Sequence, residues 1–429
     1  MTVLIAIAIA LVITNEFGTT SNVDMIAAAN YRDQVRSQFL ARSAQAFGEL
    51  MIRLQQRMDN AASSNKNMSM LGGIQLTDYA DTLIAPFCGS AEEVQGLLGF
   101  SPSQVKGLFA DPVGHCGFNE PLGTEDGKID INCANVGTQT GSNSVAGNLN
   151  NLIQALYYSP AYDNVFNEDA ADGYHRDRIT QANAILDYID KDVQIGSNRG
   201  TTEDYGYEAL KDKYYAKNTY IDTVGEMKLM RGVDDRFWSL FGDAFTAYGG
   251  CKVNLKSVKS VPLIAAILFL TADNQSDPVV TDPKKLYTLA TYVAKAGDLG
   301  ENFGSNGDFI AYVADPGASV QGIAGSGAGT VQGSAATAAL AAGLPGLSEK
   351  IGLKLNATKL ALIARTGARR TYRVEAYGEI ERKQKNADGS PVYPAIRTTI
   401  TGVWDTKLVP QNVRKPPVPN GGWVYLKED

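Results

Sequence analysis

The chain has 429 residues, of which 44% are apolar and 20% charged, so it can bury a large core and hold two or three domains. Its formal net charge is −7, whereas a nucleic-acid-binding protein normally has a basic excess. The chain contains two histidines, His115 and His175, which leaves little room for histidine-based triads or zinc sites. We therefore expect no nucleic-acid partner and no histidine-based catalysis.

The N-terminal sequence predicts one long helix that starts in a membrane. Residues 1–14 (MTVLIAIAIALVIT) carry no charge, and as a helix they would span roughly 21 Å of the ~30 Å hydrocarbon core. A signal peptide would show a basic region before this run and an A-x-A-like site after it, and neither is present. From Val23 to Leu54 apolar residues recur at steps of three and four. We expect residues 1–15 to be transmembrane and residues 16–58 to form an amphipathic stem.

The four cysteines are Cys88, Cys116, Cys133 and Cys251, and none forms a CxxC pair. Their even number and wide spacing fit two disulfides in an oxidising compartment, with three possible connectivities. We favour Cys116–Cys133 with Cys88–Cys251, because the first bond would close the loop around residues 120–130. Four buried free thiols in a cytosolic protein are the alternative.

Patterns further along the chain predict an α+β body interrupted by helices. Helical signals dominate residues 145–247, and residues 316–347 are rich in Gly, Ala and Ser, which predicts a flexible insertion. Polar and apolar residues alternate over 372–380 and again around Ile400, which predicts a hairpin packed on the stem. The expected organisation is a body of residues 59–144 and 258–410, an inserted helical domain of residues 145–257, and a C-terminal tail of residues 411–429.

An acidic stretch is the strongest candidate site. Asp187 and Asp190 are three residues apart and therefore share one helix face near its C-terminus, where the helix dipole disfavours negative charge. Further carboxylates follow at Asp192, Glu203 and Asp204. Such a cluster repels itself unless a cation is bound, and calcium prefers oxygen ligands of this kind. A solvated acidic loop is the alternative, and hydrolysis by Asp190 and Glu203 is a weaker one, because no substrate cleft is indicated.

A second acidic stretch, residues 125–130 (EDGKID), is similar to a calcium loop in part. Lys128 interrupts the pattern, and the terminal glutamate of such loops is missing. We expect a turn before a strand here rather than a metal site.

Several of these segments resemble the K-type minor pseudopilins of bacterial type II secretion systems. Residues 2–17 and 28–43 resemble the membrane helix and stem of that family, and residues 185–192 (ILDYIDKD) resemble its Asp-Trp-Ile-Asp run, with Tyr188 in place of the tryptophan. The resemblance continues at Thr202-Glu203-Asp204, Tyr214-Tyr215, Asn218, residues 226–233 and Val253-Asn254. Threonines replace the usual Gly-Ala before Glu203, and Leu255-Lys256-Ser257 replaces the usual Asn-Thr-Ala ending.

The resemblance implies a non-enzymatic pseudopilin with an inserted helical domain that binds calcium. Carried over position by position, the implied ligands are Asp190, Asp192, Glu203, Asp204 and Asn218. It also implies a single-pass inner-membrane protein with its body in the periplasm. Such a protein sits at the tip of the pseudopilus with I- and J-type minor pseudopilins, above the filament of the major pseudopilin, and meets the outer-membrane secretin or secreted cargo.

The N-terminal residues bear on this tip position. Most pilins of the class carry a glutamate at the fifth mature residue, which satisfies the charged N-terminus of a neighbour. Alignment with the family suggests that the mature chain begins about three residues before Met1, so that position five is Thr2; otherwise it is Ile5. Neither is a carboxylate, which predicts a subunit that starts or caps the filament. A minor pilin at the tip of a type IV pilus and a membrane-tethered periplasmic hydrolase are the alternatives.

Overall fold

The computed structural model divides into two compact units: Met1–Gly123 together with Tyr372–Asp429, and Thr124–Thr371. The first unit therefore contains both ends of the chain, and the second is an insertion between them. The structure describes residues 2–64, 75–88, 114–120, 122–136, 144–169, 174–191, 203–208, 210, 212–298, 303–316, 351–381, 394–408 and 422–429. The predicted flexible insertion of residues 316–347 falls, apart from Pro316, outside these ranges.

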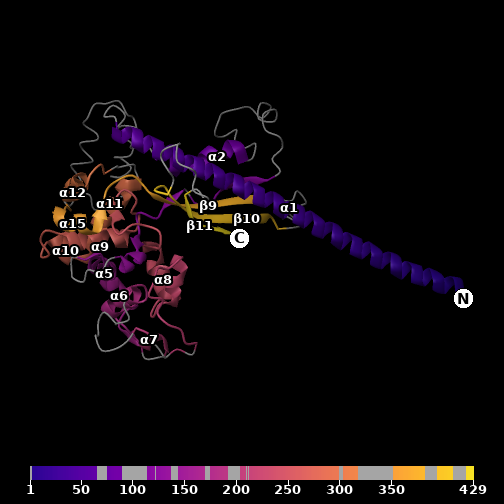
Figure 1. Cartoon of the computed structure of the whole chain (residues 1–429), viewed down its shortest axis with the longest axis horizontal. Helices are drawn as coiled ribbons and strands as arrows, with labels where there is room; N and C mark the ends of the chain where they lie inside the picture. Colours follow the sequence, from indigo (N-terminus) through magenta and orange to yellow (C-terminus); the bar gives the residue numbers. More distant parts are fainter. Residues whose placement is uncertain are drawn as a thin grey trace. The chain divides into compact units, whose positions relative to one another are not determined.

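The first unit starts with one long helix, α1 (Thr2–Ser64), shown in indigo in Figure 1. Its first part is apolar on all sides and exposed, with Leu4 72% and Leu11 65% accessible. This part is long and apolar enough to cross a membrane, with a mean hydropathy of 1.8 over its most apolar window. From Asp33 onward one face is buried, including Ala41 and Ile52. The prediction of one helix, apolar at first and amphipathic later, is confirmed.

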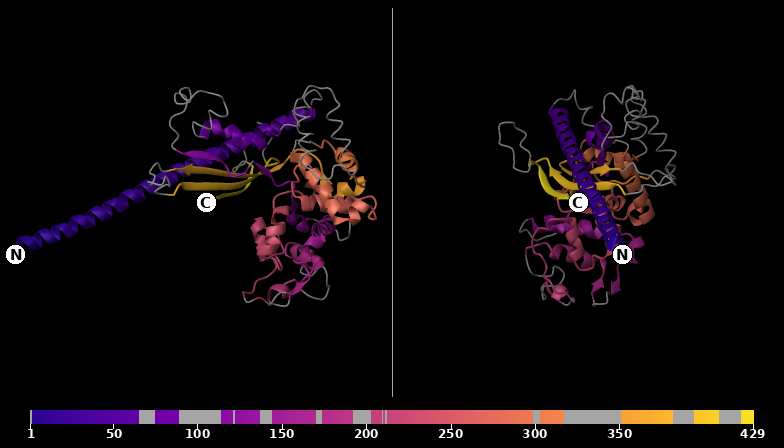
Figure 2. Two further views of the ribbon diagram at one scale, coloured as in Figure 1. Left: turned by 180° about the vertical axis from the view of Figure 1, so that it is seen from behind. Right: turned by 90° about the vertical axis from the view of Figure 1, so that its right-hand side faces the viewer.

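The buried face of α1 lies on an antiparallel sheet. The sheet order is β1 (His115–Phe118), β9 (Thr371–Ile380), β10 (Ile396–Asp405) and β11 (Trp423–Glu428), and β2 (Gly123–Thr124) also pairs with β9. Figure 2 shows these strands beside the second half of α1. Alternate residues of β9 are buried, as the sequence pattern predicted, and the α+β architecture with an antiparallel sheet on the first helix is confirmed.

The helix and the sheet approach each other very closely at Gly378 of β9. A Cβ at this position would lie 2.2 Å from the Ser37 carbonyl oxygen and 2.5 Å from the Ala41 nitrogen, so no larger residue fits. The Ser37 hydroxyl is 2.8 Å from both the Gly378 carbonyl oxygen and the Thr398 hydroxyl. Small side chains and a buried hydroxyl therefore fix α1 on the sheet.

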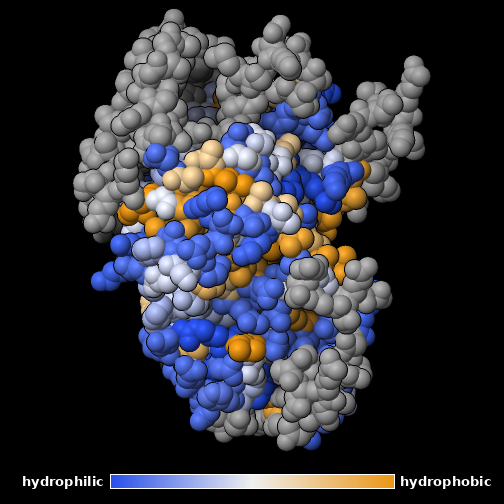
Figure 3. Space-filling view, turned by 90° about the vertical axis from the view of Figure 1, so that its left-hand side faces the viewer, coloured by the Kyte–Doolittle hydropathy of each residue, from blue (hydrophilic) through white to orange (hydrophobic). Residues whose placement is uncertain are grey.

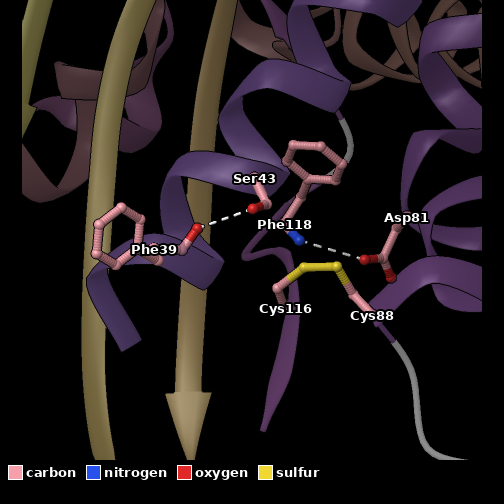
Figure 4. The surroundings of a disulfide bond; sticks show 6 residues. All are labelled: Phe39, Ser43, Asp81, Cys88, Cys116 and Phe118. Atoms are coloured by element: carbon pink, nitrogen blue, oxygen red, sulfur yellow. Dashed lines mark hydrogen bonds between the residues drawn. A yellow bond between two sulfur atoms is a disulfide. The ribbon is translucent and has the colours of Figure 1, made fainter. Parts of the chain in front are cut away.

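A disulfide and a short helix complete the first unit. Helix α2 (Ala80–Cys88) follows the 3-10 turn η2 (Leu76–Tyr79), and Cys88 at its end is bonded to Cys116 of β1, with 5.0 Å between the Cα atoms. Figure 4 shows the Phe118 N–H donating to Asp81 of α2 beside this bond, at 3.3 Å. The disulfide and this hydrogen bond both join α2 to the edge strand β1.

The second unit is mainly helical, as expected for the inserted domain. Its helices are α5 (Val145–Leu156), α6 (Arg178–Asp187), α7 (Tyr205–Glu208), α8 (Asp235–Phe241), α9 (Val261–Thr271), α10 (Pro278–Thr281), α11 (Pro283–Asp298), α12 (Asn306–Ala314) and α15 (Ala357–Ile363). Single 3-10 turns occur at η3 (Ile131–Asn135), η4 (Pro160–Tyr162), η5 (Val224–Leu229) and η6 (Gly242–Ala244). Three short strand pairs join β3 (Ile129–Asp130) to β6 (Phe245–Thr246), β4 (Glu168–Asp169) to β5 (His175–Arg176), and β7 (Val253–Asn254) to β8 (Ala364–Arg365).

Helix α9 is the centre of this unit. Its sequence, VPLIAAILFLT, is apolar on every side, and the residues from Leu263 to Leu268 are at most 3% exposed. Ser260 begins the helix by accepting a hydrogen bond from the Leu263 N–H at 3.4 Å, and Pro262 fits its first turn. A helix with no polar face is stable only when other elements surround it. The face of the molecule in Figure 3 shows mainly hydrophilic side chains, with a band of hydrophobic ones across its middle.

The predicted disulfide pairing is wrong: the structure pairs Cys88 with Cys116 and Cys133 with Cys251. The expected Cys116–Cys133 bond would have joined two units, because Cys116 lies in β1 and Cys133 in η3. Cys133 meets Cys251 instead because β3, just before η3, pairs with β6, a few residues before Cys251. The pairing of β3 with β6, rather than closeness in sequence, thus determines which cysteine bonds to Cys133.

The boundaries of the units also differ from the predicted ones. Residues 258–371, expected in the body, belong to the second unit, because α9, α11, α12 and α15 share one apolar core with α5. Residues 124–144 join the same unit. The expected C-terminal tail, residues 411–429, contributes β11, which pairs antiparallel with β10.

We expect the double substitution of Cys133 and Cys251 by serine to destabilise the second unit. The bond links residues 118 apart in sequence, and a disulfide that closes a long loop typically contributes about 2–4 kcal/mol by restricting the unfolded chain. Thermal unfolding followed by circular dichroism should show a lower Tm than the wild type. The matched double substitution of Cys88 and Cys116, which are 28 residues apart, should have a smaller effect, and an unchanged Tm for both variants would contradict this account.

We expect Asp130 to make stability fall as pH rises from about 4 to about 6. Burial raises the pKa of Asp130 to about 6 from an ordinary value of 3.8, although the Asn132 N–H and Arg370 oppose the shift. Between these values the unfolded chain has lost the proton that the folded chain keeps, so raising the pH favours unfolding by up to about 3 kcal/mol.

The substitution Asp130→Asn tests this, because asparagine can still accept the 3.0 Å hydrogen bond from the Asn132 N–H. Urea unfolding at pH 7 should show the variant gaining stability relative to the wild type, and the gain should vanish at about pH 4. A difference between the two proteins that is independent of pH would refute the assignment.

Candidate functional site

The candidate site lies at the C-terminal end of α6. Asp177 begins this helix by accepting hydrogen bonds from the backbone N–H groups of Ile179 and Thr180, at 2.8 and 2.9 Å. Ala182, Ile185 and Ile189 are fully buried in the core of the second unit. The Asn135 side-chain amide donates to the Ile189 carbonyl at 3.0 Å. The end of α6 is therefore fixed by packing and by a buried hydrogen bond.

Three carboxylates meet at this helix end. Asp187, the last residue of α6, Asp190 and Glu203 each place one carboxylate oxygen within 4.8 Å of the other two. Glu203 is 4% exposed and Asp187 9% exposed. Like charges at this distance repel in a partly buried site, and the negative end of the α6 dipole adds to the repulsion. A bound cation would remove both penalties.

Asn218 lies next to the helix end that carries these carboxylates. Its backbone N–H donates to the Tyr188 carbonyl oxygen at 3.0 Å, which holds it next to the residue that follows Asp187. Its φ of 46° is in the left-handed region, which asparagine tolerates better than most residues. The Oδ1 atom is buried and has no hydrogen-bond partner among the described residues. A buried carbonyl oxygen of this kind is an available ligand for a hard cation.

The structure brings together some of the predicted ligands and not others. Asp190 and Glu203 meet as expected, and Asn218 lies beside the helix end that carries Asp190. Asp204 lies outside the three-carboxylate group formed by the described residues, and its side chain accepts a hydrogen bond from the Ala216 N–H at 3.1 Å. Asp192 falls outside the described residues. Asp187 was absent from the ligand set taken from the resemblance, although its spacing of three residues from Asp190 already placed both on one helix face.

A cluster of tyrosines packs next to the site. The Tyr207 ring lies 5.7 Å from that of Tyr188 and 5.0 Å from that of Tyr214, measured between centroids. Burial raises the pKa of Tyr207, so its hydroxyl stays neutral and accepts a hydrogen bond from the Arg231 N–H at 3.3 Å. The Tyr214 hydroxyl donates to the Leu229 carbonyl. These contacts tie the segment that carries Glu203 and Asn218 to the loop after η5.

Lys217 directly precedes Asn218 in the sequence, and its ammonium forms ion pairs with two carboxylates. Its ammonium lies 2.7 Å from Glu226 and 3.3 Å from Asp222. Burial alone would lower the pKa of Lys217, because it disfavours the charged form. The hydrogen bonds to these two carboxylates raise the pKa of Lys217 overall. Glu226 also accepts from the Asp222 and Thr223 N–H groups, at 2.7 and 3.1 Å. Lys217 therefore stabilises the loop formed by residues 217–226.

The second acidic stretch is a turn before a strand, as predicted. Residues 125–128 form the turn that leads into β3. Lys128 forms an ion pair with Glu125 at 3.2 Å, and Arg365 forms one with Asp126 at 3.0 Å. These carboxylates are neutralised by basic side chains, and they do not gather into a metal-binding group with the other described residues.

Comparison with known proteins places the site in a known family. Residues 147–242 match the family model described as "Type II secretion system (T2SS), protein K". This segment is therefore similar to protein K of the type II secretion system. It runs from α5 to the end of α8 and contains all three carboxylates and Asn218.

The chain is also similar to a chain in the crystal structure of the GspK–GspI–GspJ complex from the enterotoxigenic Escherichia coli type 2 secretion system. The similarity covers 75% of this chain and 82% of that chain, with 13% sequence identity and a TM-score of 0.40. No curated protein sequence matches the chain.

The donor set of the matched segment decides which chemistry it can support. The described ligand candidates are carboxylate and amide oxygens, which suit a hard cation such as calcium better than zinc. The four cysteines are all held in disulfides, so no thiolate is offered. The residues present thus fit a divalent cation bound by oxygen.

Proposed function

We propose that the chain is a membrane-anchored minor pseudopilin at the tip of the type II secretion pseudopilus, where it starts or caps the filament. The match of residues 147–242 to protein K carries this proposal. The exposed apolar start of α1 would anchor the protein in the inner membrane, with both units in the periplasm. Two disulfides suit that oxidising compartment. Its task is binding and assembly rather than catalysis.

The partners proposed for the tip complex are the I- and J-type minor pseudopilins, above the filament of the major pseudopilin. Several large apolar side chains on the stem part of α1 face away from the sheet, including Phe39, which is 62% exposed, and Leu50, which is 49% exposed. In a complex these side chains would pack against the equivalent helices of the partners. The second unit would then face the outer-membrane secretin or the secreted cargo and support export.

We propose that the acidic site binds calcium, held by Asp187, Asp190, Glu203 and Asn218, with Asp192 as a further ligand from the adjacent segment. Asp204 then has a supporting role, because its hydrogen bond to Ala216 fixes the segment that leads to Asn218. Calcium would supply positive charge that offsets the repulsion between the carboxylates. The bound cation would make the second unit rigid outside the cytoplasm.

Calcium should therefore raise the Tm of the wild-type protein, and a chelator should lower it by several degrees. A ligand that binds only the folded state at a hundredfold excess over Kd contributes about 2.7 kcal/mol. The variants Asp190→Asn and Asn218→Gly should each weaken calcium binding by about tenfold or more in calorimetry. Glycine is chosen at position 218 because it removes Oδ1 and accepts the positive φ.

Asp212→Asn is the matched control, because Asp212 is an exposed acid in the same region. Its affinity for calcium should equal that of the wild type. Identical melting curves with calcium and with chelator would refute the metal proposal and leave the assignment to the pseudopilus intact.

The assignment to the pseudopilus is tested by co-purification of the full chain with I- and J-type partners. We expect a stable complex and a loss of affinity of about tenfold for Phe39→Ala, because a large aromatic side chain would be buried at the interface. The Tm of the variant alone should barely change, because Phe39 is exposed. Tyr215→Ala, which removes an aromatic side chain that is 67% exposed in the second unit, is the control and should bind normally. A wild-type chain that stays monomeric with both partners would overturn the proposal.

A further inference from the structure

The 3-10 turn η3 contacts both parts of the proposed calcium site. The buried Asn135 amide donates to the Ile189 carbonyl at 3.0 Å, and Ile189 belongs to the helix end that carries the carboxylates. At the start of the turn, the Asn132 side chain accepts a hydrogen bond from the Ile221 N–H at 2.8 Å and donates to the Ile221 carbonyl at 3.0 Å. Ile221 lies three residues after Asn218. One short turn therefore holds the acidic helix end and the loop that carries Asn218.

A disulfide joins the same turn to a third segment, residues 245–251. Cys133 lies in the middle of η3 and is bonded to Cys251. The Asn132 side chain also donates to the Ala247 carbonyl at 2.9 Å. Strand β3, which directly precedes η3, pairs with β6 at the start of this segment. The disulfide is thus the covalent part of a contact that positions η3.

A thiol in solution can reach this disulfide from the side of Cys251. Cys251 is exposed, whereas Cys133 is 3% exposed. A Cβ at Gly250 would meet nothing within 4 Å, so there is open space next to Cys251. A thiolate can therefore attack the Cys251 sulfur and displace Cys133. Complete reduction by a dithiol breaks the S–S bond, takes up two electrons and two protons to form two thiols, and oxidises the dithiol to a disulfide.

We propose that the Cys133–Cys251 disulfide controls the calcium affinity of the acidic site through η3. While the bond is closed, η3 holds the ligands in position before binding, which lowers the entropy lost when the cation binds. Reduction would release η3 and weaken calcium binding. Because coupling between two sites is reciprocal, calcium must also make the disulfide harder to reduce. This inference rests on the proposed calcium site and adds to it a redox control by a thiol reductant.

The reduction potential of the disulfide in the full wild-type chain tests this coupling. The protein is equilibrated in dithiothreitol redox buffers with saturating calcium or with chelator, and its free thiols are alkylated and quantified by mass spectrometry of the cysteine peptides. We expect calcium to bind about tenfold more weakly to the reduced form, which lowers the potential of Cys133–Cys251 by about 30 mV when both forms are saturated. The potential of Cys88–Cys116, which belongs to the other unit, is the internal control and should not shift.

The outcomes separate the coupling from the calcium site itself. Absence of calcium binding to the oxidised protein in calorimetry would refute the calcium site, and the coupling with it. Calcium binding with an unchanged potential of Cys133–Cys251 would overturn the coupling alone, and so would equal shifts for both disulfides. A shift that keeps growing as calcium is raised would show that the reduced form is unfolded and binds no calcium, which would also overturn control through η3.

The substitution Asn132→Ala tests η3 as the connection while the disulfide stays intact. It removes the side-chain hydrogen bonds to Ile221 and Ala247, so that η3 no longer holds the loop that carries Asn218. We expect the calcium affinity of the oxidised variant to fall about tenfold in calorimetry. The calcium-dependent shift in the potential of its disulfide should fall to less than about half of the wild-type shift.

Asn356→Ala is the matched control, because it removes an asparagine of the same unit that does not contact η3. Asn356 begins α15 by accepting hydrogen bonds from the Thr358 and Lys359 N–H groups, at 3.0 and 3.1 Å. Its loss should lower the Tm and leave the calcium affinity and the shift in potential unchanged. Equal effects of the two substitutions on calcium binding would indicate a loss of overall stability rather than a role for η3, and would overturn the proposal.

Discussion

The contact between α1 and β9 at Gly378 is the constraint on which the first unit depends. The helix backbone lies so close to the strand that the position has room for hydrogen only, and the Ser37 hydroxyl bridges to two strands at the same point. Close approach lets small side chains on both surfaces exclude water over a long contact. A helix that extends well beyond the sheet can be held firmly in this way.

The second unit combines a wholly apolar central helix with an acidic helix end. Helix α9 is enclosed by apolar side chains, whereas α6 ends with carboxylates at the negative end of its own dipole. The two features are compatible because Asn135 and the buried isoleucines of α6 hold the helix end in place against the repulsion. The acidic group is therefore positioned by the fold itself, as the proposed cation site would require. Pre-positioned ligands lower the entropy lost on binding.

Helices and strands that depend on local patterns could be predicted from the sequence. Pairings between residues far apart in the sequence could not. The spacing of apolar residues predicted α1, and alternation predicted β9 and β10, because both patterns depend on neighbouring residues only. The predicted disulfide pairing was wrong, because which cysteines pair depends on the unit that contains each of them. The run that became α9 was placed in the wrong unit because a wholly apolar helix gives no sign of which core it fills. Strand β11 is short and follows a proline-rich stretch, so it was taken for a tail.

The candidate site shows the same division. Asp187 and Asp190 were found from their helical spacing, and Glu203 from its place among the carboxylates of the same acidic stretch. Asp204 accepts a hydrogen bond from the Ala216 N–H, and Asn218, with its left-handed backbone, donates one to the Tyr188 carbonyl. Both contacts depend on how residues 203–222 fold back beside the end of α6. No pattern in the sequence contains that information.

The discontinuity of the first unit has a consequence for the order of events in biosynthesis. The inserted unit is continuous in sequence and ends at Thr371, whereas three strands of the sheet come from the residues that follow or begin there. During vectorial synthesis and translocation, the insertion can thus reach its native form while the stem helix still lacks the surface it packs on. The sheet of the first unit is complete only once β11 has been made and has paired with β10, so the stem helix gains its full packing surface after the inserted unit has been synthesised.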